Sequence, residues 1–191
     1  LGGIIPSDIG NLSNLKILNL GYNNLSGELP TSLGSLGNLD SLKINGNDSL
    51  GGIIPLEIGN LSNLKILNLG YNNLTGELPP SLGSLENLEK LNISGNDSLG
   101  GIIPSEIGNL SQLEILKLNN NNLIGSLSDS IFNLYNLKEF LLWGNLLNGE
   151  ISENICNLDS LVYISISDNN FIGLIPDCIC SLNDLIWYDQ F

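Results

Sequence analysis

The sequence predicts an α/β solenoid of about eight coils, each 24–25 residues long. The first observation behind this prediction is a pattern of the form LxxLxxLxLxxNxLxGxLP, which begins at Leu12 and recurs along the chain. Its asparagine recurs in steps of 24, 25, 24, 25, 24 and 24 residues, at Asn23, Asn47, Asn72, Asn96, Asn121, Asn145 and Asn169. The second is composition, because the 42% of hydrophobic residues are mostly Leu and Ile. One coil cannot enclose its own leucines, so we expect each coil to use its neighbours as the walls of one core.

Each part of a coil has its own expected structure. The segment KILNLGY at 16–22 alternates apolar and polar residues, which predicts a strand buried on one face. Stacked coils place such strands side by side and parallel, roughly 4.8 Å apart. The asparagine that follows is predicted to satisfy backbone groups of its own and the adjacent coil, which makes a structural asparagine ladder. The LxGxLP segment is expected to be extended, and the last part, such as PSEIGNL at 104–110, to form a short turn or helical piece.

A longer period is superimposed on the coils. Residues 1–49 and 50–98 differ at nine positions, and a third copy opens at Leu99 before diverging. The duplicated unit is therefore two coils. Four of the nine differences fall at exposed strand positions, namely Asp40/Glu89, Ser41/Lys90, Lys43/Asn92 and Asn45/Ser94.

The repeated pattern resembles the plant-type leucine-rich repeat found in receptor-kinase ectodomains and in polygalacturonase-inhibiting proteins. The resemblance covers residues 1–191 as a single domain and implies a right-handed, curved solenoid. It places the parallel sheet on the concave face and short turns or 3-10 pieces on the convex face. It also implies a secreted or cell-surface setting. The half-coil at 1–11 and the terminal coil at 182–191 suggest a segment of a longer protein. The sequence departs from the family pattern at Ser128 and Ser152, which stand where proline is expected.

The net charge of the chain limits which kinds of molecule it can bind. The formal net charge is −14, which argues against nucleic acid or an anionic membrane as a partner. No apolar run is long enough to span a bilayer, and no signal peptide is visible in this segment. All six cations fall in the strand segments, at Lys16, Lys43, Lys65, Lys90, Lys117 and Lys138. One face is therefore expected to be mixed in charge, while the rest of the surface is anionic.

Residues at equivalent positions form columns across the predicted sheet. One column reads Lys16, Asp40, Lys65, Glu89, Glu114, Lys138, Val162, Ile186, and its opposite charges are expected to pair across strands. Lys43, Lys90 and Lys117 have no such partner in the sequence pattern, so we predict that they meet a ligand.

Aromatic side chains are the other candidates for ligand contact. The next column reads Ile17, Ser41, Ile66, Lys90, Ile115, Glu139, Tyr163, Trp187, which predicts that Tyr163 stacks with Trp187. Exposed aromatic rings are common contact anchors for proteins, peptides and sugars. The predicted ligand-binding residues are therefore Tyr22, Lys43, Tyr71, Lys90, Lys117, Trp143, Tyr163 and Trp187. For Trp187 the alternative is that it covers the last coil.

The three cysteines allow two interpretations. Cys156 and Cys180 are 24 residues apart at equivalent positions, so stacked coils bring them within reach of a disulfide and leave Cys178 free. Alternatively, all three are reduced thiols that fill small spaces. Zinc is a poor interpretation, because there is no histidine and no CxxC pair. Sequons for N-glycosylation occur at Asn11, Asn24, Asn47, Asn60, Asn73, Asn92, Asn96 and Asn109, although the repeat itself generates this combination.

These features predict a non-enzymatic recognition module with no cofactor, which binds a protein or peptide through the concave sheet. With no histidine and no phosphate-binding glycine loop, catalysis has little chemical basis. One alternative is an inhibitor of a secreted wall-degrading hydrolase, by the resemblance to polygalacturonase inhibitors. The other is a structural or ice-binding solenoid, which we disfavour because the chain has only Thr31 and Thr75 to build threonine rows.

Overall fold

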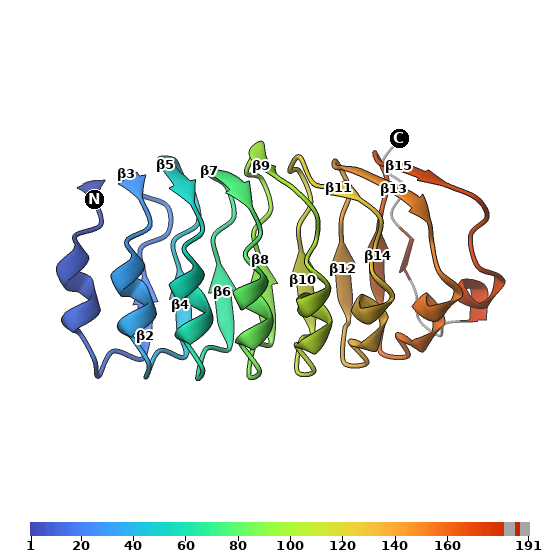
Figure 1. The fold of residues 1–191 in the computed structure, drawn as a ribbon, viewed down its shortest axis with the longest axis horizontal. Helices are drawn as coiled ribbons and strands as arrows, with labels where there is room; N and C mark the ends of the chain where they lie inside the picture. Colours follow the sequence, from blue (N-terminus) through green and yellow to red (C-terminus); the bar gives the residue numbers. More distant parts are fainter. Residues whose placement is uncertain (182–185, 188–191) are drawn as a thin grey trace.

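The structure is a computed structural model in which the coils stack in chain order along the long axis, with the N-terminus at one end (Figure 1). It describes residues 1–181 and 186–187. One side of the stack is an eight-stranded parallel sheet, called here the long sheet. Its strands are β2 (Ile17–Asn19), β4 (Ser41–Lys43), β6 (Ile66–Asn68), β8 (Lys90–Asn92), β10 (Ile115–Lys117), β12 (Glu139–Leu141), β14 (Tyr163–Ser165) and β16 (Ile186–Trp187).

A second row of parallel strands runs along the top edge of the stack in Figure 1. We call it the edge sheet, and it is interrupted between β9 and β11, where Ile102 and Ile124 form an isolated bridge. The sequence analysis expected only extended segments here. The strands are β1 (Gly2–Ile4), β3 (Asn24–Glu28), β5 (Asn47–Ile53), β7 (Asn72–Glu77), β9 (Ser98–Gly100), β11 (Ile124–Gly125), β13 (Leu146–Glu150) and β15 (Asn170–Ile172).

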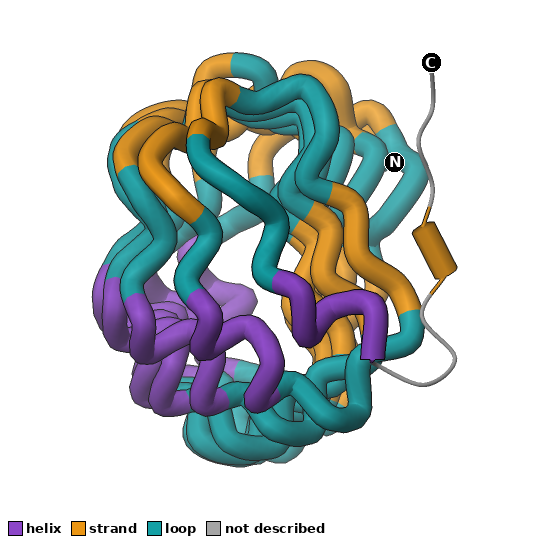
Figure 2. Tube along the Cα trace, turned by 90° about the vertical axis from the view of Figure 1, so that its right-hand side faces the viewer, coloured by secondary structure: helices purple, strands orange, loops and turns teal. Residues whose placement is uncertain are grey.

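Short 3-10 helices close each coil on the side opposite the long sheet (Figure 2). They are η1 (Ser7–Asn11), η2 (Thr31–Ser35), η3 (Leu56–Asn60), η4 (Pro80–Ser84), η5 (Ser105–Asn109), η6 (Asp129–Asn133), η7 (Glu153–Asn157) and η8 (Asp177–Ser181). A proline with φ near −70° precedes the earlier ones, because its ring holds the extended conformation that enters the turn. At η6 and η7 the preceding residue is Ser128 or Ser152, whose hydroxyl accepts a hydrogen bond from the backbone two residues on. This hydroxyl cap compensates for the missing proline.

The core is a continuous column of aliphatic side chains between the two sheets and the helices. In the coil that contains β6, Leu64, Leu67 and Leu69 are completely buried, as are their counterparts in the coils on either side. Phe132 and Phe140 are the largest buried side chains. Each coil thus supplies apolar surface that only its neighbours cover, as the repeat predicts.

The ladder asparagines are hydrogen-bonded on both sides. Asn96 is completely buried; its Nδ2 donates to the carbonyls of Ile93 (3.0 Å) and Leu69 (3.2 Å). Its Oδ1 accepts from the backbone N–H of Leu74 at 3.0 Å. Asn47 repeats these contacts in the preceding unit. The side chain therefore joins the end of the long sheet to the start of the edge sheet in an adjacent coil.

The disulfide differs from the predicted one. Cys156 is bonded to Cys178 with their Cα atoms 5.9 Å apart, so the predicted pairing of Cys156 with Cys180 is wrong; the side chain of Cys180 lies outside those described. The cause is the register of the helices: the fourth residue of one lies against the second residue of the next, not against the fourth. A Cβ added to Gly59, the fourth residue of η3, would lie 2.7 Å from Cβ of Ser81, the second of η4. Cys156 and Cys178 occupy these same two positions in η7 and η8.

Candidate ligand-binding surface

The outward face of the long sheet is the surface that sequence analysis proposed for ligand binding. Its central column of Ile17, Ser41, Ile66, Lys90, Ile115, Glu139 and Tyr163 is confirmed by the register of β2 to β14. At the last strand the expected register is wrong by one residue. Ile186 lies opposite Tyr163 and Trp187 lies opposite Ile164, so Trp187 does not continue the column of Tyr163. The side chain of Trp187 lies outside those described.

The three candidate lysines have different surroundings. Lys90 on β8 is exposed and Lys43 on β4 is half-buried, and in the described part of the chain neither has an acid within ion-pair distance. Lys117 on β10, predicted to be unpaired, instead forms an ion pair with Glu139 on β12 at 2.7 Å. That expectation is therefore wrong for Lys117, whose ammonium already has a carboxylate partner.

The neighbouring column carries two of the ion pairs expected for it. Lys65 lies 3.5 Å from Glu89, and Lys138 lies 3.0 Å from Glu114. These pairs are well exposed, so each contributes only a few tenths of a kcal/mol, about the value typical of surface pairs. No such pair involves Lys16 within residues 1–181.

Apolar groups gather on the C-terminal half of the same face. Tyr163 begins β14 and Trp143 follows β12 by two residues, and both are half-buried. Leu141, between Lys117 and Ser165 in its column, is only 9% exposed although it points to the outward face. Sequence analysis missed Leu141. The available signal was a leucine at a strand position that is Asn or Lys in the five coils before it, at Asn19, Lys43, Asn68, Asn92 and Lys117.

Tyr22 and Tyr71 do not lie on the strands. Each occupies the turn between the long sheet and a ladder asparagine, with a left-handed φ of 54°. Their side chains are 82% and 54% exposed, and the rings lie against Gly46 and Gly95 of the following coils. These tyrosines therefore belong to the rim between the two sheets.

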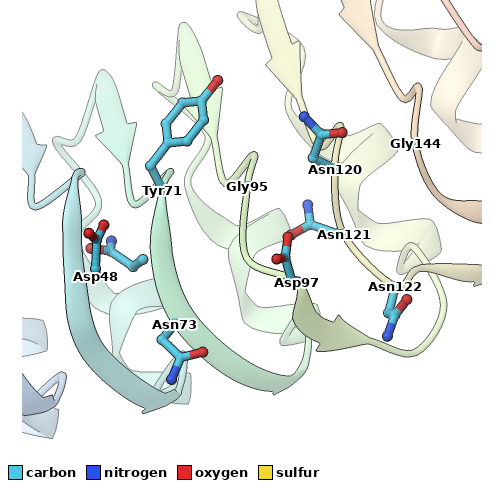
Figure 3. Close-up of a pocket in the computed structure, with 10 residues that line it drawn as sticks. Asp48, Tyr71, Asn73, Gly95, Asp97, Asn120, Asn121, Asn122 and Gly144 are labelled. Carbon is cyan, nitrogen blue, oxygen red and sulfur yellow. The ribbon is translucent and has the colours of Figure 1, made fainter.

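A polar hollow of about 610 Å³ opens on that rim. Figure 3 shows Asp97 near its centre, with Tyr71 and Asn73 on one side and Asn120 and Asn122 on the other. The lining residues come from successive coils and are Asp48, Tyr71, Asn72, Asn73, Gly95, Asp97, Asn120, Asn121, Asn122 and Gly144. We call it the rim hollow. Sequence analysis missed it.

The described ranges 1–181 and 186–187 contain neither a metal-binding group of side chains nor a membrane-spanning helix. No group of three or more His, Cys, Asp and Glu side chains there has the arrangement to hold a metal ion. No helix in the same ranges combines the length and apolar character needed to cross a membrane.

Comparison with known families identifies the repeat. A model described as "Leucine Rich repeats (2 copies)" matches residues 62–105. A second, described as "Leucine Rich Repeat", matches residues 14–36, 112–134 and 160–182, and together the matches cover more than half of the chain. The chain therefore belongs to the leucine-rich repeat family, and its structural neighbours show the plant type. A search of curated protein sequences returned no match.

Solved structures of plant receptors are similar over nearly the whole chain. The plant peptide hormone receptor RGFR1, solved in complex with RGF2, is 40% identical with a TM-score of 0.94, over 96% of this chain and 29% of that one. The Arabidopsis receptor kinase HAESA, solved with the peptide hormone IDA and the co-receptor SERK1, is 38% identical with a TM-score of 0.91, over 96% of this chain and 30% of that one. This chain thus spans less than a third of the length of either receptor.

A plant ice-binding protein is also similar, at lower values. It is 28% identical with a TM-score of 0.69, over 92% of this chain and 71% of that one. The chain is thus more similar to the receptor ectodomains than to the ice-binding protein, and the alternatives to ligand recognition are not favoured.

Proposed function

We propose that this chain is a non-catalytic recognition module that binds a peptide or protein through the outward, concave face of its long sheet, outside the cell or at its surface. The observation that carries the proposal is its similarity to RGFR1 and HAESA, both solved with bound peptides. The position of the chain within a longer receptor is part of the same proposal.

The chemistry of the long sheet supports this use. Lys43 and Lys90 supply cations without acidic partners among the described residues, and they lie toward the N-terminal half of the sheet. Trp143 and Tyr163 lie toward the C-terminal half beside the apolar Leu141. A bound extended peptide would therefore place acidic groups near the lysines and an apolar side chain near Trp143. The strands are held by a continuous core, so the surface is preformed and loses little entropy on binding.

The proposal is tested with peptides selected for binding. Random dodecapeptides displayed on phage are selected on the immobilised protein, and the affinity of the synthetic peptides is measured by calorimetry. We expect Trp143→Ala to weaken binding by at least about tenfold, because buried aromatic anchors dominate such interfaces. Lys90→Ala is expected to weaken peptides that carry acidic residues.

A matched control lies on the opposite side of the coil. Leu56 begins η3 and is 63% exposed, so Leu56→Ala removes an accessible apolar group away from the long sheet. Selected peptides that bind Trp143→Ala and Lys90→Ala as tightly as the parent protein, or that lose affinity for Leu56→Ala, would contradict binding on the long sheet.

A further inference from the structure

The rim hollow includes the position at which the third copy of the two-coil unit has asparagine in place of tyrosine. The position before each ladder asparagine has a left-handed φ, at Tyr22, Gly46, Tyr71, Gly95, Asn120, Gly144 and Asp168. Tyrosine and glycine alternate in the first two units, and each tyrosine ring covers the glycine of the next coil. In the third unit the tyrosine is replaced by Asn120, whose Oδ1 would lie 2.6 Å from a Cβ added to Gly144.

The shorter side chain of Asn120 leaves open the space that a ring fills in the earlier units. The hollow extends from Asp48, past Tyr71, to Gly144, with Asn120 in its lining (Figure 3). In the preceding unit Tyr71 itself stands at the position equivalent to Asn120. The smaller side chain of Asn120 therefore contributes to the open space at the C-terminal part of the hollow.

The groups that line the hollow have unused hydrogen-bonding capacity. Asp48, Asn73, Asp97 and Asn122 are exposed, and in the described part of the chain their side chains have no protein partner. The ladder members Asn72 and Asn121 are different, because their amides are bonded to the backbone. The hollow thus presents carboxylates that only accept hydrogen bonds and carboxamides that both donate and accept.

This combination of carboxylates and carboxamides suits a ligand rich in hydroxyl groups. A hydroxyl donates to a carboxylate and accepts from a carboxamide, so it can use both kinds of group at once. A guanidinium or ammonium ion only donates, so it could bond to the carboxylates but not accept from the amide N–H groups of Asn73, Asn120 and Asn122. The ring of Tyr71 adds a partly apolar surface on which the C–H face of a sugar ring can rest.

The negative charge of the hollow determines which charge a ligand can carry. Asp48 and Asp97 both line it, and no lysine does. An anionic sugar such as a uronate would be repelled, whereas a neutral sugar can hydrogen-bond to both carboxylates. Asp48 and Asp97 lie two coils apart, roughly 10 Å by the spacing of parallel strands, which is about the length of two sugar rings.

We propose that the rim hollow is a binding site for a neutral oligosaccharide, with Tyr71 as the stacking surface and Asp48, Asp97, Asn73, Asn120 and Asn122 as hydrogen-bonding partners. The site lies on the rim and does not depend on peptide binding by the long sheet. The shallow, open shape indicates weak binding, with a dissociation constant on the order of 1 mM.

The test uses neutral hexasaccharides of β-linked glucose, xylose and N-acetylglucosamine, with hexagalacturonate as the anionic counterpart. Because Asn73 is also a sequon acceptor, the protein is produced in a host that lacks N-glycosylation. Saturation-transfer NMR and calorimetry are expected to show saturable binding of at least one neutral hexamer and none of hexagalacturonate.

Three variants, at the equivalent position of three successive units, locate the site. Asn120→Tyr restores the residue of the earlier units at the same φ, beside the bare Cα of Gly144, and is expected to fold and to lose at least about tenfold in affinity. Tyr71→Asn removes the stacking surface and is expected to weaken binding by a similar factor. Tyr22→Asn makes the same change outside the hollow and should leave sugar binding unchanged.

The proposal is overturned if no neutral hexamer binds at about 10 mM, or if binding is unaffected in a folded Asn120→Tyr variant, since about 10 mM exceeds the expected dissociation constant tenfold. Binding of hexa-arginine in place of the sugars, abolished by Asp97→Asn, would also overturn it and would assign the hollow to a cationic peptide. The peptides selected for the long sheet are measured on Asn120→Tyr as well, so that failure of either proposal is seen separately.

Discussion

The ring of Tyr71 lies across the bare Cα of Gly95 in the next coil. A Cβ built on Gly95 would lie 2.8 Å from Cδ1 and 3.1 Å from Cε1 of that ring. Tyr22 and Gly46 form the same contact in the preceding unit, at the same distances. The contact links the two coils of each unit, because the ring leaves no room for a Cβ at the glycine of the next coil.

Replacement of Gly95 by alanine should therefore destabilise the fold. The variant forces an alanine into a left-handed φ of 68° and drives its methyl group into the ring. We expect the free energy of unfolding to fall by about 2 kcal/mol, most of it from the left-handed backbone. Chemical denaturation followed by circular dichroism measures the change.

Two further variants separate the causes in Gly95→Ala. Gly37→Ala is the matched control, because nothing lies within 4 Å of a Cβ added there and Glu86 holds the equivalent position. Its unfolding free energy should change by less than about 0.5 kcal/mol. Adding Tyr71→Asn to Gly95→Ala should recover part of the loss. If Gly37→Ala is as destabilising as Gly95→Ala, neither the left-handed backbone nor the contact with Tyr71 is the cause.

Removal of a ladder side chain should be more damaging than removal of an exposed asparagine. Asn96→Ala leaves the buried N–H of Leu74 and the carbonyls of Ile93 and Leu69 without their side-chain partner. We expect a loss of about 3 kcal/mol or more, because buried polar groups left unpaired carry their full desolvation penalty. Urea titration of the variant and the parent protein gives the difference.

Asn63 supplies the comparison for Asn96. Its amide donates one hydrogen bond, at 2.7 Å, to the carbonyl of Gly37 from an exposed position. Water can replace this bond, so Asn63→Ala should lose no more than about 1 kcal/mol. Equal losses for Asn63→Ala and Asn96→Ala would show that burial of the ladder amides does not determine their contribution.

The ion pair between Lys117 and Glu139 should be the strongest of the pairs on the long sheet. Its atoms are 2.7 Å apart and the side chains are 32% and 35% exposed, compared with 3.5 Å, 55% and 41% for Lys65 and Glu89. Double-mutant cycles to alanine should give a coupling of about 0.5–1 kcal/mol for the first pair and about 0.2 kcal/mol for the second. Added salt should weaken the exposed pair more. A larger coupling for Lys65 and Glu89 would contradict this order.

The leucine-rich repeat solenoid and the register of the long sheet could be predicted as far as the ladder asparagines extend. The spacing from Asn23 to Asn169 places equivalent residues on adjacent strands, and the column up to Tyr163 follows. Beyond Asn169 no further asparagine marks the coil, and the step from Tyr163 to its partner Ile186 is 23 residues, so extrapolation by 24 fails.

The edge sheet, the disulfide partner and the rim hollow depend on contacts between coils that the repeat pattern does not encode. Edge-sheet strands such as Asn24–Glu28 are joined through backbone groups and contain glycine, which is depleted in strands. The open space at the C-terminal part of the hollow depends in part on the volume of one side chain, Asn120. Neither the spacing nor the polarity of the sequence reports these distances.

The register of the last two helices determines which cysteines are bonded. Because the fourth residue of η7 lies against the second residue of η8, Cys156 should be bonded to Cys178 in the protein isolated under oxidising conditions. Proteolysis without reduction, followed by mass spectrometry, should give a linked pair of peptides that joins these two residues. A link between Cys156 and Cys180 would show instead that equivalent positions of the two helices are in contact, contrary to the register seen between Gly59 and Ser81.

Loss of the bridge should destabilise the C-terminal coils. The bridge spans 22 residues, a length for which closure of the unfolded chain is worth about 3 kcal/mol. Cys178→Ser should lower the unfolding free energy by about that amount, and a reducing agent should then have no further effect on the variant. Cys180→Ser leaves Cys156 and Cys178 in place and should keep both the linked peptides and the sensitivity to reductant. If Cys180→Ser is the variant that loses this sensitivity, the pairing of Cys156 with Cys178 is wrong.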